Sequence, residues 1–131
     1  MRLMTVDVDW RRFEELVAEL FRGFGYTVEL TKQTRDGGKD IIAIKRAEVQ
    51  VKYLIECKRP DPGGLVGVCP VRELLGVWQD EKATKAILAT TAYFSKPAKV
   101  LFDKHPWILE PKEYDDIKKW IDLYMNIKGL D

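Results

Sequence analysis

Three residues in the first half of the chain have the types and spacing that metal-dependent phosphodiester chemistry needs. Asp40 follows a Gly-Gly turn, and Glu56 and Lys58 are separated by one residue within an apolar, strand-like run. Two carboxylates brought together form a site for a hard divalent cation, because Mg²⁺ prefers oxygen ligands. A lysine beside that site supplies a positive charge for a water molecule or a phosphate oxygen. The pattern is therefore typical of a Mg²⁺ site that cuts phosphodiesters, provided that the fold unites these residues.

The run from Val49 to Lys58 predicts a β-strand. Strand side chains alternate between faces, so Glu56 and Lys58 share a face with Leu54, and Cys57 lies on the other face. Apolar residues on both faces indicate an interior strand. Taken alone, a Glu-x-Lys sequence in a strand is more often a salt bridge, or a strand end that reaches solvent, than a catalytic site.

Asp40 lies at the start of the preceding expected strand, residues 39–45, and residues 46–48 are expected to join the two strands as a hairpin. A turn at that place pairs residue 40 with a position near 54–56, which brings Asp40 within reach of Glu56. Two carboxylates that close repel each other unless a cation lies between them. The simpler interpretation of Asp40 alone is an aspartate that caps the turn.

An amphipathic helix before these strands offers a third acid. Its apolar residues recur with helical spacing, and Gly25 is expected to end it: Phe13, Leu16, Val17, Leu20, Phe21 and Phe24. Helical geometry puts Glu14 on the border of the apolar stripe and turns Glu15 and Glu19 towards solvent. Glu14 is therefore the acid that could reach over the sheet, although an ordinary boundary glutamate would look the same.

The remaining pattern predicts one α/β domain. We expect a strand at 26–31, a loop at 59–67, a helix around 71–78, a strand at 85–91, a helix capped by Ser95, a short strand at 107–109 and a last helix. The order αβββαβαβα indicates a central mixed β-sheet flanked by helices on both faces. The single domain is expected to span residues 1–131, with a core at about 10–110 and a C-terminal helix at about 111–127.

Composition restricts the possible functions. The 131 residues suit one domain, and the net charge of +1 gives no argument from bulk charge for binding nucleic acid. Apolar runs are too short for a membrane helix, and the N-terminus lacks a signal-peptide pattern. Two cysteines are too few for a disulfide scaffold, so we expect a cytoplasmic protein with free thiols. The presence of a single histidine, His105, argues against a histidine triad or a zinc site.

Several short motifs together resemble the Mrr-like branch of the restriction-endonuclease-like, or PD-(D/E)xK, nuclease superfamily. The motifs, in chain order, are Phe13-Glu14-x-Leu16, Gly25-Tyr26-x-Val28, Asp36-Gly37-Gly38-x-Asp40, Glu56-Cys57-Lys58, Val71-Arg72-Glu73-Leu74-x-Gly76 and Ala89-Thr90-Thr91-x-Tyr93-Phe94-Ser95-x-x-Ala98. The resemblance covers roughly residues 12–110. The Asp-Gly-Gly-x-Asp and Glu-Cys-Lys blocks in this order are its most specific part.

The resemblance implies the restriction-endonuclease-like fold and a metal-dependent deoxyribonuclease that hydrolyses phosphodiester bonds. It implies Mg²⁺ as the cofactor, for which Mn²⁺ can substitute. In such enzymes the acids that match Asp40 and Glu56 bind the metal, and the lysine that matches Lys58 positions or activates the attacking water. The helix acid that matches Glu14 completes the metal site. All four positions are present in this sequence.

The resemblance implies DNA as the substrate. It also implies a possible role in restriction or defence. We expect its phosphates to contact basic residues near the site, although each of these is also typical of a solvated surface charge: Lys32, Arg35, Lys39, Arg59 and Arg72. The segments outside the expected core are short, which leaves sequence-specific recognition of DNA open and makes a separate DNA-recognition partner one option. A homodimer is also compatible with the sequence.

Two other functions remain open from the sequence. Holliday-junction resolvases and RecB-like exonucleases use similar arrangements of acids, Glu-x-Lys and a helix glutamate. The Asp-Gly-Gly-x-Asp and Thr-Thr-x-x-Phe-Ser segments favour the Mrr-like branch over both. The second alternative is a non-catalytic domain that binds nucleic acid or joins a larger assembly, which the near-neutral charge also suits.

Overall fold

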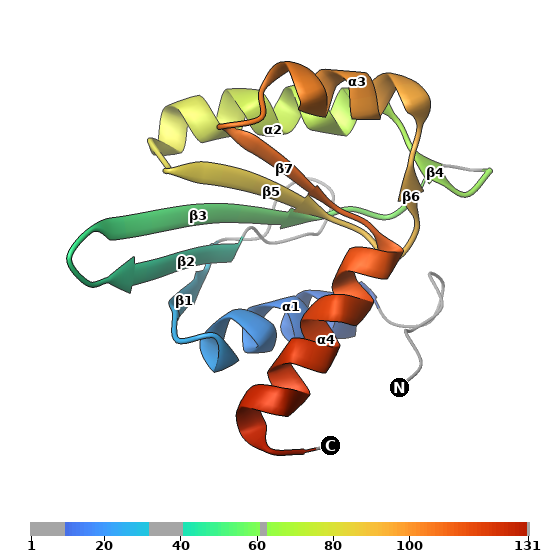
Figure 1. Ribbon diagram of the computed structural model, residues 1–131. Helices are drawn as coiled ribbons and strands as arrows, with labels where there is room; N and C mark the ends of the chain where they lie inside the picture. Colours follow the sequence, from blue (N-terminus) through green and yellow to red (C-terminus); the bar gives the residue numbers. More distant parts are fainter. Residues whose placement is uncertain (1–9, 32–40, 61–62, 131) are drawn as a thin grey trace.

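The computed structural model describes residues 10–31, 41–60 and 63–130, and it has helices on both faces of a mixed sheet (Figure 1). The described elements are α1 (Trp10–Gly23), β1 (Thr27–Leu30), β2 (Ile41–Arg46), β3 (Gln50–Cys57), β4 (Leu65–Val66), α2 (Val68–Glu81), β5 (Lys85–Ala89), β6 (Tyr93–Phe94), α3 (Lys96–Lys104), β7 (Leu109–Lys112) and α4 (Tyr114–Lys128).

The main sheet has five strands in the order β1-β2-β3-β5-β7. The first three strands pair antiparallel, whereas β5 and β7 add to β3 in parallel. Antiparallel strands need only a tight turn, and parallel strands need the crossover helices that α2 and α3 supply. The predicted fold class is therefore confirmed, and β3 is the interior strand that its two-sided apolar pattern indicated.

Two hydrophobic layers enclose the sheet, one on each face. Ile55 and Cys57 of β3 pack with α1 and α4, whereas Leu54 packs with α2 and α3. Figure 1 shows α2 and α3 together on one side of the sheet and α1 and α4 on the other. The alternation predicted for β3 is thus confirmed at each buried position, and it defines the face to which Glu56 belongs.

The buried face of α1 is the face that the sequence predicted. Phe13, Val17 and Phe21 are buried against the sheet, and Gly25 ends the helical segment with φ +99°, a conformation that glycine adopts without strain. Glu14 is only 8% exposed, whereas Glu15 and Glu19 are exposed. The border position predicted for Glu14 is therefore confirmed.

The hairpin of β2 and β3 also has the expected register. Arg46 pairs with Gln50 at the turn end, and Ile41 pairs with Ile55 at the other end. The connecting turn occupies residues 47–49, one position later than predicted. The difference is small because the hydrophobic alternation of the two strands fixes the register.

Two short strands were not predicted. The segment 59–67, expected to be a loop, contains β4, and β4 pairs in parallel with β6 through Leu65 opposite Tyr93. Ser95 continues this ladder by donating its backbone N–H to the carbonyl of Val66 at 2.9 Å. Strands of two residues are too short for a recognisable alternation, so nothing in the sequence pattern marks them.

The prediction for the last strand was wrong by two residues. The expected strand at 107–109 begins with Trp107, but that side chain is 87% exposed and β7 starts at Leu109. β7 contains Pro111, which the sheet tolerates because β7 is an edge strand. The apolar run of Trp107 and Ile108 was misleading because only the following residues pair with β5.

The structure also defines where α2 and α3 begin. The hydroxyl of Ser95 accepts the backbone N–H of Ala98 at 3.3 Å, which confirms the predicted cap of α3. α2 begins at Val68, so Cys69 lies within this helix instead of before it.

Both cysteines are free thiols, with Cys57 buried and Cys69 exposed. None of the described helices is long and apolar enough to cross a membrane.

Candidate active site

The carboxyl ends of β3 and β5 lie together at one end of the sheet. The backbone N–H of Lys58 donates to the carbonyl of Ala89 at 2.9 Å, so the parallel ladder continues one residue beyond Cys57. This bond fixes the backbone of Lys58 against the neighbouring strand. In open α/β sheets, ligands bind in the crevice beyond the carboxyl ends of the strands. The residues at this end are therefore placed where a substrate can approach.

Glu56 lies on the interior strand one position before the end of β3, opposite Leu88 of β5. Its neighbours Ile55 and Cys57 belong to the core beneath α1 and α4, so alternation directs Glu56 to the face of Leu54. The continuing ladder extends this alternation to Lys58. Glu56 and Lys58 are both partly buried and come from the same face at the same end of the sheet.

Glu14 approaches this end of the sheet from the opposite face. The guanidinium of Arg59 lies 5.6 Å from the centroid of the Trp10 ring, which joins the start of α1 to the residue after Lys58. Glu14 follows Trp10 by four residues and therefore lies on the same side of the helix. The first turn of α1 is thus next to the end of β3, and Glu14 is buried there. Because Glu14 and Glu56 come from opposite faces of the sheet, their side chains can meet only beyond its end.

Asp40 lies outside the residues that the structure describes, as do Lys32, Arg35 and Lys39. The first described residue of β2 is Ile41, which pairs with Ile55. Within the ranges 10–31, 41–60 and 63–130, no three or more His, Cys, Asp or Glu side chains gather closely enough to hold a metal ion. The roles of all four residues stay predictions.

Arg59 and Arg72 are the described members of the predicted DNA-contacting set. Both are exposed, Arg59 immediately after Lys58 and Arg72 in the second turn of α2. Arg59 also rests on Trp10, an interaction that holds its guanidinium near the end of β3. Arg59 therefore has a defined place beside the site. Arg72 lies on α2, which follows β4 in the chain.

Sequence reasoning missed Trp10 at this end of the sheet, and it named Thr90 and Thr91 as part of a motif without the burial that the structure shows. Trp10 was not selected, because a tryptophan three residues before Phe13 looks like one more member of the apolar stripe of α1. Thr90 is fully buried after β5, and its hydroxyl accepts the backbone N–H of Ala92 at 3.2 Å. The next hydroxyl, that of Thr91, is buried without a hydrogen-bond partner in the described part of the chain. Thr91 therefore offers a polar group beside the end of β5.

The sheet order, the paired helix layers and the Glu-x-Lys strand define a restriction-endonuclease-like nuclease domain. A family model described as restriction endonuclease (Mrr_cat) matches residues 5–120. This match covers most of the chain, so the chain belongs to the Mrr_cat restriction endonuclease family. The family resemblance stated from the sequence motifs is confirmed.

Comparison with known proteins adds relatives in sequence and in structure. The chain is 34% identical over 92 residues to the uncharacterized protein y4cE of Sinorhizobium fredii (strain NBRC 101917 / NGR234), a match that covers 70% of this chain and 24% of that protein. It therefore spans about a quarter of the relative's length.

Two solved structures share the fold. The DNA modification-dependent restriction endonuclease AspBHI matches with a TM-score of 0.68 and 20% identity, over 94% of this chain and 36% of AspBHI. The restriction endonuclease MspJI, solved in complex with a 27-mer oligonucleotide, matches with a TM-score of 0.66 and 18% identity, over 93% of this chain and 30% of MspJI. At these identities the likeness concerns the fold, and this chain corresponds to about a third of each enzyme.

Proposed function

We propose that this domain is a Mg²⁺-dependent DNA endonuclease. In this proposal Asp40, Glu56 and Glu14 bind the metal, and Lys58 positions the attacking water. The observation that carries the proposal is the pairing of Ile41 with Ile55. Asp40 is bonded to Ile41, and Glu56 is bonded to Ile55, so the register supports a meeting of the two acids at the end of β3. Membership of a restriction endonuclease family supports the same reaction.

The donor set fits a hard divalent cation. Carboxylate oxygens are the protein ligands that Mg²⁺ prefers, and Mn²⁺ accepts the same ligands. Glu14 is buried at the start of α1 and Glu56 is partly buried on β3, so the protein already bears the cost of withdrawing these acids from water. A cation shared between them and Asp40 offsets that cost and their mutual repulsion.

Each residue then has a separate task. A bound Mg²⁺ supplies positive charge that polarises the scissile phosphate and stabilises the leaving oxygen. Lys58 holds the attacking water and partly neutralises the charge that develops on the phosphate. An electrostatic role suits Lys58 better than that of a general base, because neighbouring carboxylates favour its charged form. The backbone bond from Lys58 to Ala89 fixes the backbone of this residue at the end of the sheet, which supports the proposed role.

DNA binding is proposed to rest on a local basic patch, since the whole chain carries a net charge of only +1. Lys32, Arg35 and Lys39 precede β2 in the sequence, Arg59 follows Lys58, and Arg72 lies on α2. Two relatives in fold support DNA as the polymer, because AspBHI is described as a DNA modification-dependent restriction endonuclease and MspJI was solved with an oligonucleotide. One site cuts one strand, so cleavage of both strands takes two copies of the chain or two successive nicks. A role in restriction or defence and a separate recognition partner belong to the same proposal.

A plasmid-nicking assay tests the proposed function. Supercoiled DNA is incubated with the wild-type protein in Mg²⁺, in Mn²⁺ and in EDTA, and the same is done with Glu56→Gln. Glu15→Gln is the matched control, because Glu15 is an exposed acid on α1. We expect nicking by the wild type and by Glu15→Gln in either metal, with none in EDTA or from Glu56→Gln. Wild-type activity of a folded Glu56→Gln protein would refute the assignment.

A further inference from the structure

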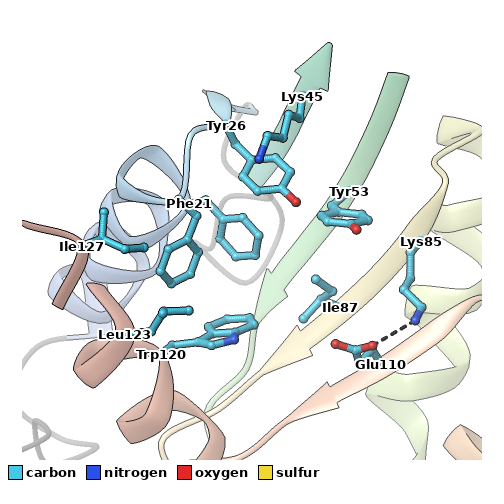
Figure 2. A pocket seen from close by; sticks show the side chains of 11 residues that line it. Phe21, Tyr26, Lys45, Tyr53, Lys85, Ile87, Glu110, Trp120, Leu123 and Ile127 are labelled. Carbon is cyan, nitrogen blue, oxygen red and sulfur yellow. Dashed lines mark hydrogen bonds and ion pairs between the residues drawn. The ribbon is translucent and has the colours of Figure 1, made fainter. Parts of the chain in front are cut away.

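A pocket with a volume of about 390 Å³ lies on the face of the sheet that α1 and α4 cover (Figure 2). Five of its eleven lining residues are aromatic: Phe21, Phe24, Tyr26, Tyr53 and Trp120. Ile87 of β5 lines it from the sheet, and the exposed side chains of Leu123 and Ile127 lie at its edge on α4. Ligand pockets measure roughly 300–1,000 Å³, so this one suits a small occupant.

Phe21 stands at a steep angle to its neighbouring rings, whereas Tyr26 and Tyr53 are tilted by 34° relative to each other. Phe21 meets Tyr53 at an interplanar angle of 75° and Trp120 at 85°, with centroids 6.4 and 5.2 Å away. Edge-to-face contacts of this kind are favourable and hold the ring orientations. Figure 2 shows the labelled rings around one common space. Such a wall offers flat apolar surfaces to a planar guest.

Charged groups on the rim are mainly positive. Lys85 contacts one carboxylate oxygen of Glu110 at 2.9 Å, and Lys112 contacts the other at 3.1 Å. Lys45 is exposed and lies 5.3 Å from the centroid of the Tyr26 ring. The lining itself thus holds two lysines, Lys45 and Lys85, and one carboxylate, Glu110, which leaves an excess of one positive charge beside the rings. An anionic group on the guest would be attracted to this rim.

The pocket is separate from the candidate active site. Lys85 and Glu110 lie at the beginnings of β5 and β7, whereas Lys58 lies at the carboxyl end of the parallel strands. Tyr53 and Lys58 are five residues apart on an extended strand, which corresponds to roughly 17 Å. The pocket therefore lies towards the other end of the sheet and takes no part in the proposed metal site.

We propose that this pocket binds a single nucleotide unit, with the base against the aromatic wall and the phosphate at Lys45 and Lys85. A nucleotide combines the two properties that the pocket selects, a planar heteroaromatic ring and a negative charge. Aromatic side chains stack on any base, so little preference among the bases is expected. Organic cations are disfavoured, because Lys45 and Lys112 already lie over the Tyr26 and Trp120 rings. The inference does not depend on the proposed cleavage.

Calorimetric titration in EDTA tests the pocket without any cleavage. The probes are the four deoxynucleoside 5′-monophosphates, deoxyadenosine, inorganic phosphate and a 5′-phosphorylated trinucleotide. We expect saturable binding of the nucleotides, with deoxyadenosine and phosphate each at least about tenfold weaker, because each lacks one of the two contacts. Tighter binding of the trinucleotide would identify a DNA strand end as the occupant, and equal binding would identify a free nucleotide.

Two variants and a matched control locate the binding. Lys45→Ala should weaken nucleotide binding about two- to fivefold and leave deoxyadenosine unchanged, because only the phosphate contact is lost. Tyr53→Leu should weaken both by about fivefold or more. Arg46→Ala should change neither, because Arg46 is exposed beside Lys45 and points to the opposite face. No saturable binding of any nucleotide, or wild-type affinity in both Lys45→Ala and Tyr53→Leu, would overturn the inference.

Discussion

Ile41 lies directly opposite Ile55 in the antiparallel ladder of β2 and β3. Continued by one residue, this register would pair Asp40 with Glu56, the two acids that the sequence singled out. The neighbouring ladder brings Lys58 to the same end of the sheet through its bond to Ala89. The proposed chemistry therefore depends on strand pairing that the hydrophobic alternation of β2 and β3 determines.

Lys58 allows a test of its proposed electrostatic role. Lys58→Met removes the charge and should slow nicking by about 10²–10³-fold, the usual effect of losing one group that stabilises the transition state. Lys58→Arg keeps the charge and should retain a measurable part of the rate. Single-turnover rates on a plasmid, measured at several pH values, give the comparison. If Lys58→Arg were as inactive as Lys58→Met, a proton-transfer role for the lysine would be favoured instead.

Arg59 should contribute to DNA affinity without any preference for sequence. Arg59→Ala removes one exposed cation beside the site, so binding should weaken and the slope of log affinity against log salt should fall by about one unit. Fluorescence anisotropy with a labelled duplex in EDTA measures both quantities. Arg46→Ala is the matched control, because Arg46 ends β2 at the far end of the hairpin. Equal losses in the two variants would mean that Arg59 is not part of a localised DNA-binding surface.

Two glycines in helices should respond in opposite ways to substitution by alanine. A methyl group at Gly23, the last residue of α1, would overlap the ring of Tyr124 on α4, whereas a methyl group at Gly76 in α2 meets no atom within 4 Å. Gly23→Ala should therefore lower the free energy of unfolding by about 1–3 kcal/mol through overpacking. Gly76→Ala should raise it by about 0.5–1 kcal/mol through helix propensity.

Urea unfolding measures both effects. The double variant Gly23→Ala/Tyr124→Ala should lose less stability than the sum of the two single variants, because the overlap disappears with the ring. Additive losses would mean that α1 and α4 do not pack at Gly23 as described.

Glu110 gives a pH-dependent stability. Burial raises the pKa of its carboxyl, but contacts with Lys85 and Lys112 outweigh this effect and hold the pKa below its ordinary value of 4.5. A lowered pKa in the folded state means that the stabilisation is complete above the unfolded pKa and is lost as the pH falls through the folded pKa. The side chain is 35% exposed, so the contribution at neutral pH is at most about 1 kcal/mol.

Urea unfolding of Glu110→Gln checks this prediction. The variant should be less stable than the wild type at pH 7, and the difference should shrink as the pH falls below 4.5 towards about pH 3. A difference that stayed constant over this range would mean that the charge of Glu110 contributes nothing.

Much of the fold could be predicted because regular periodicity extends over long elements. The stripe of α1 identified Glu14 as the border acid, and the two-sided apolar pattern of β3 identified an interior strand. The misses were local. β4 and β6 have two residues each, and β7 was misplaced because Trp107 looks like a strand residue although 87% of it is exposed. Tertiary pairing, which no short window of sequence contains, decides such cases.

The candidate site was predictable in its types of residue and less so in its surroundings. Glu56 and Lys58 followed from strand alternation, and Asp40 followed from its place after the Gly-Gly turn and from counting residues along the hairpin. The contact between Trp10 and Arg59 could not be predicted, because it joins the start of one helix to a residue after a distant strand. The aromatic pocket was missed for the same reason. Tyr26, Tyr53 and Trp120 look like ordinary core residues until the fold assembles them.

The most direct test of the central claim is the initial rate of Mg²⁺-dependent plasmid nicking by Asp40→Asn relative to the wild type. Asp103→Asn, an exposed aspartate on α3, is the matched control, and circular dichroism establishes that each variant is folded. We predict a loss of more than about a hundredfold for Asp40→Asn and no loss for Asp103→Asn, because Asp40, unlike Asp103, is proposed to bind the metal. A folded Asp40→Asn protein that nicks DNA at the wild-type rate would contradict the proposed site.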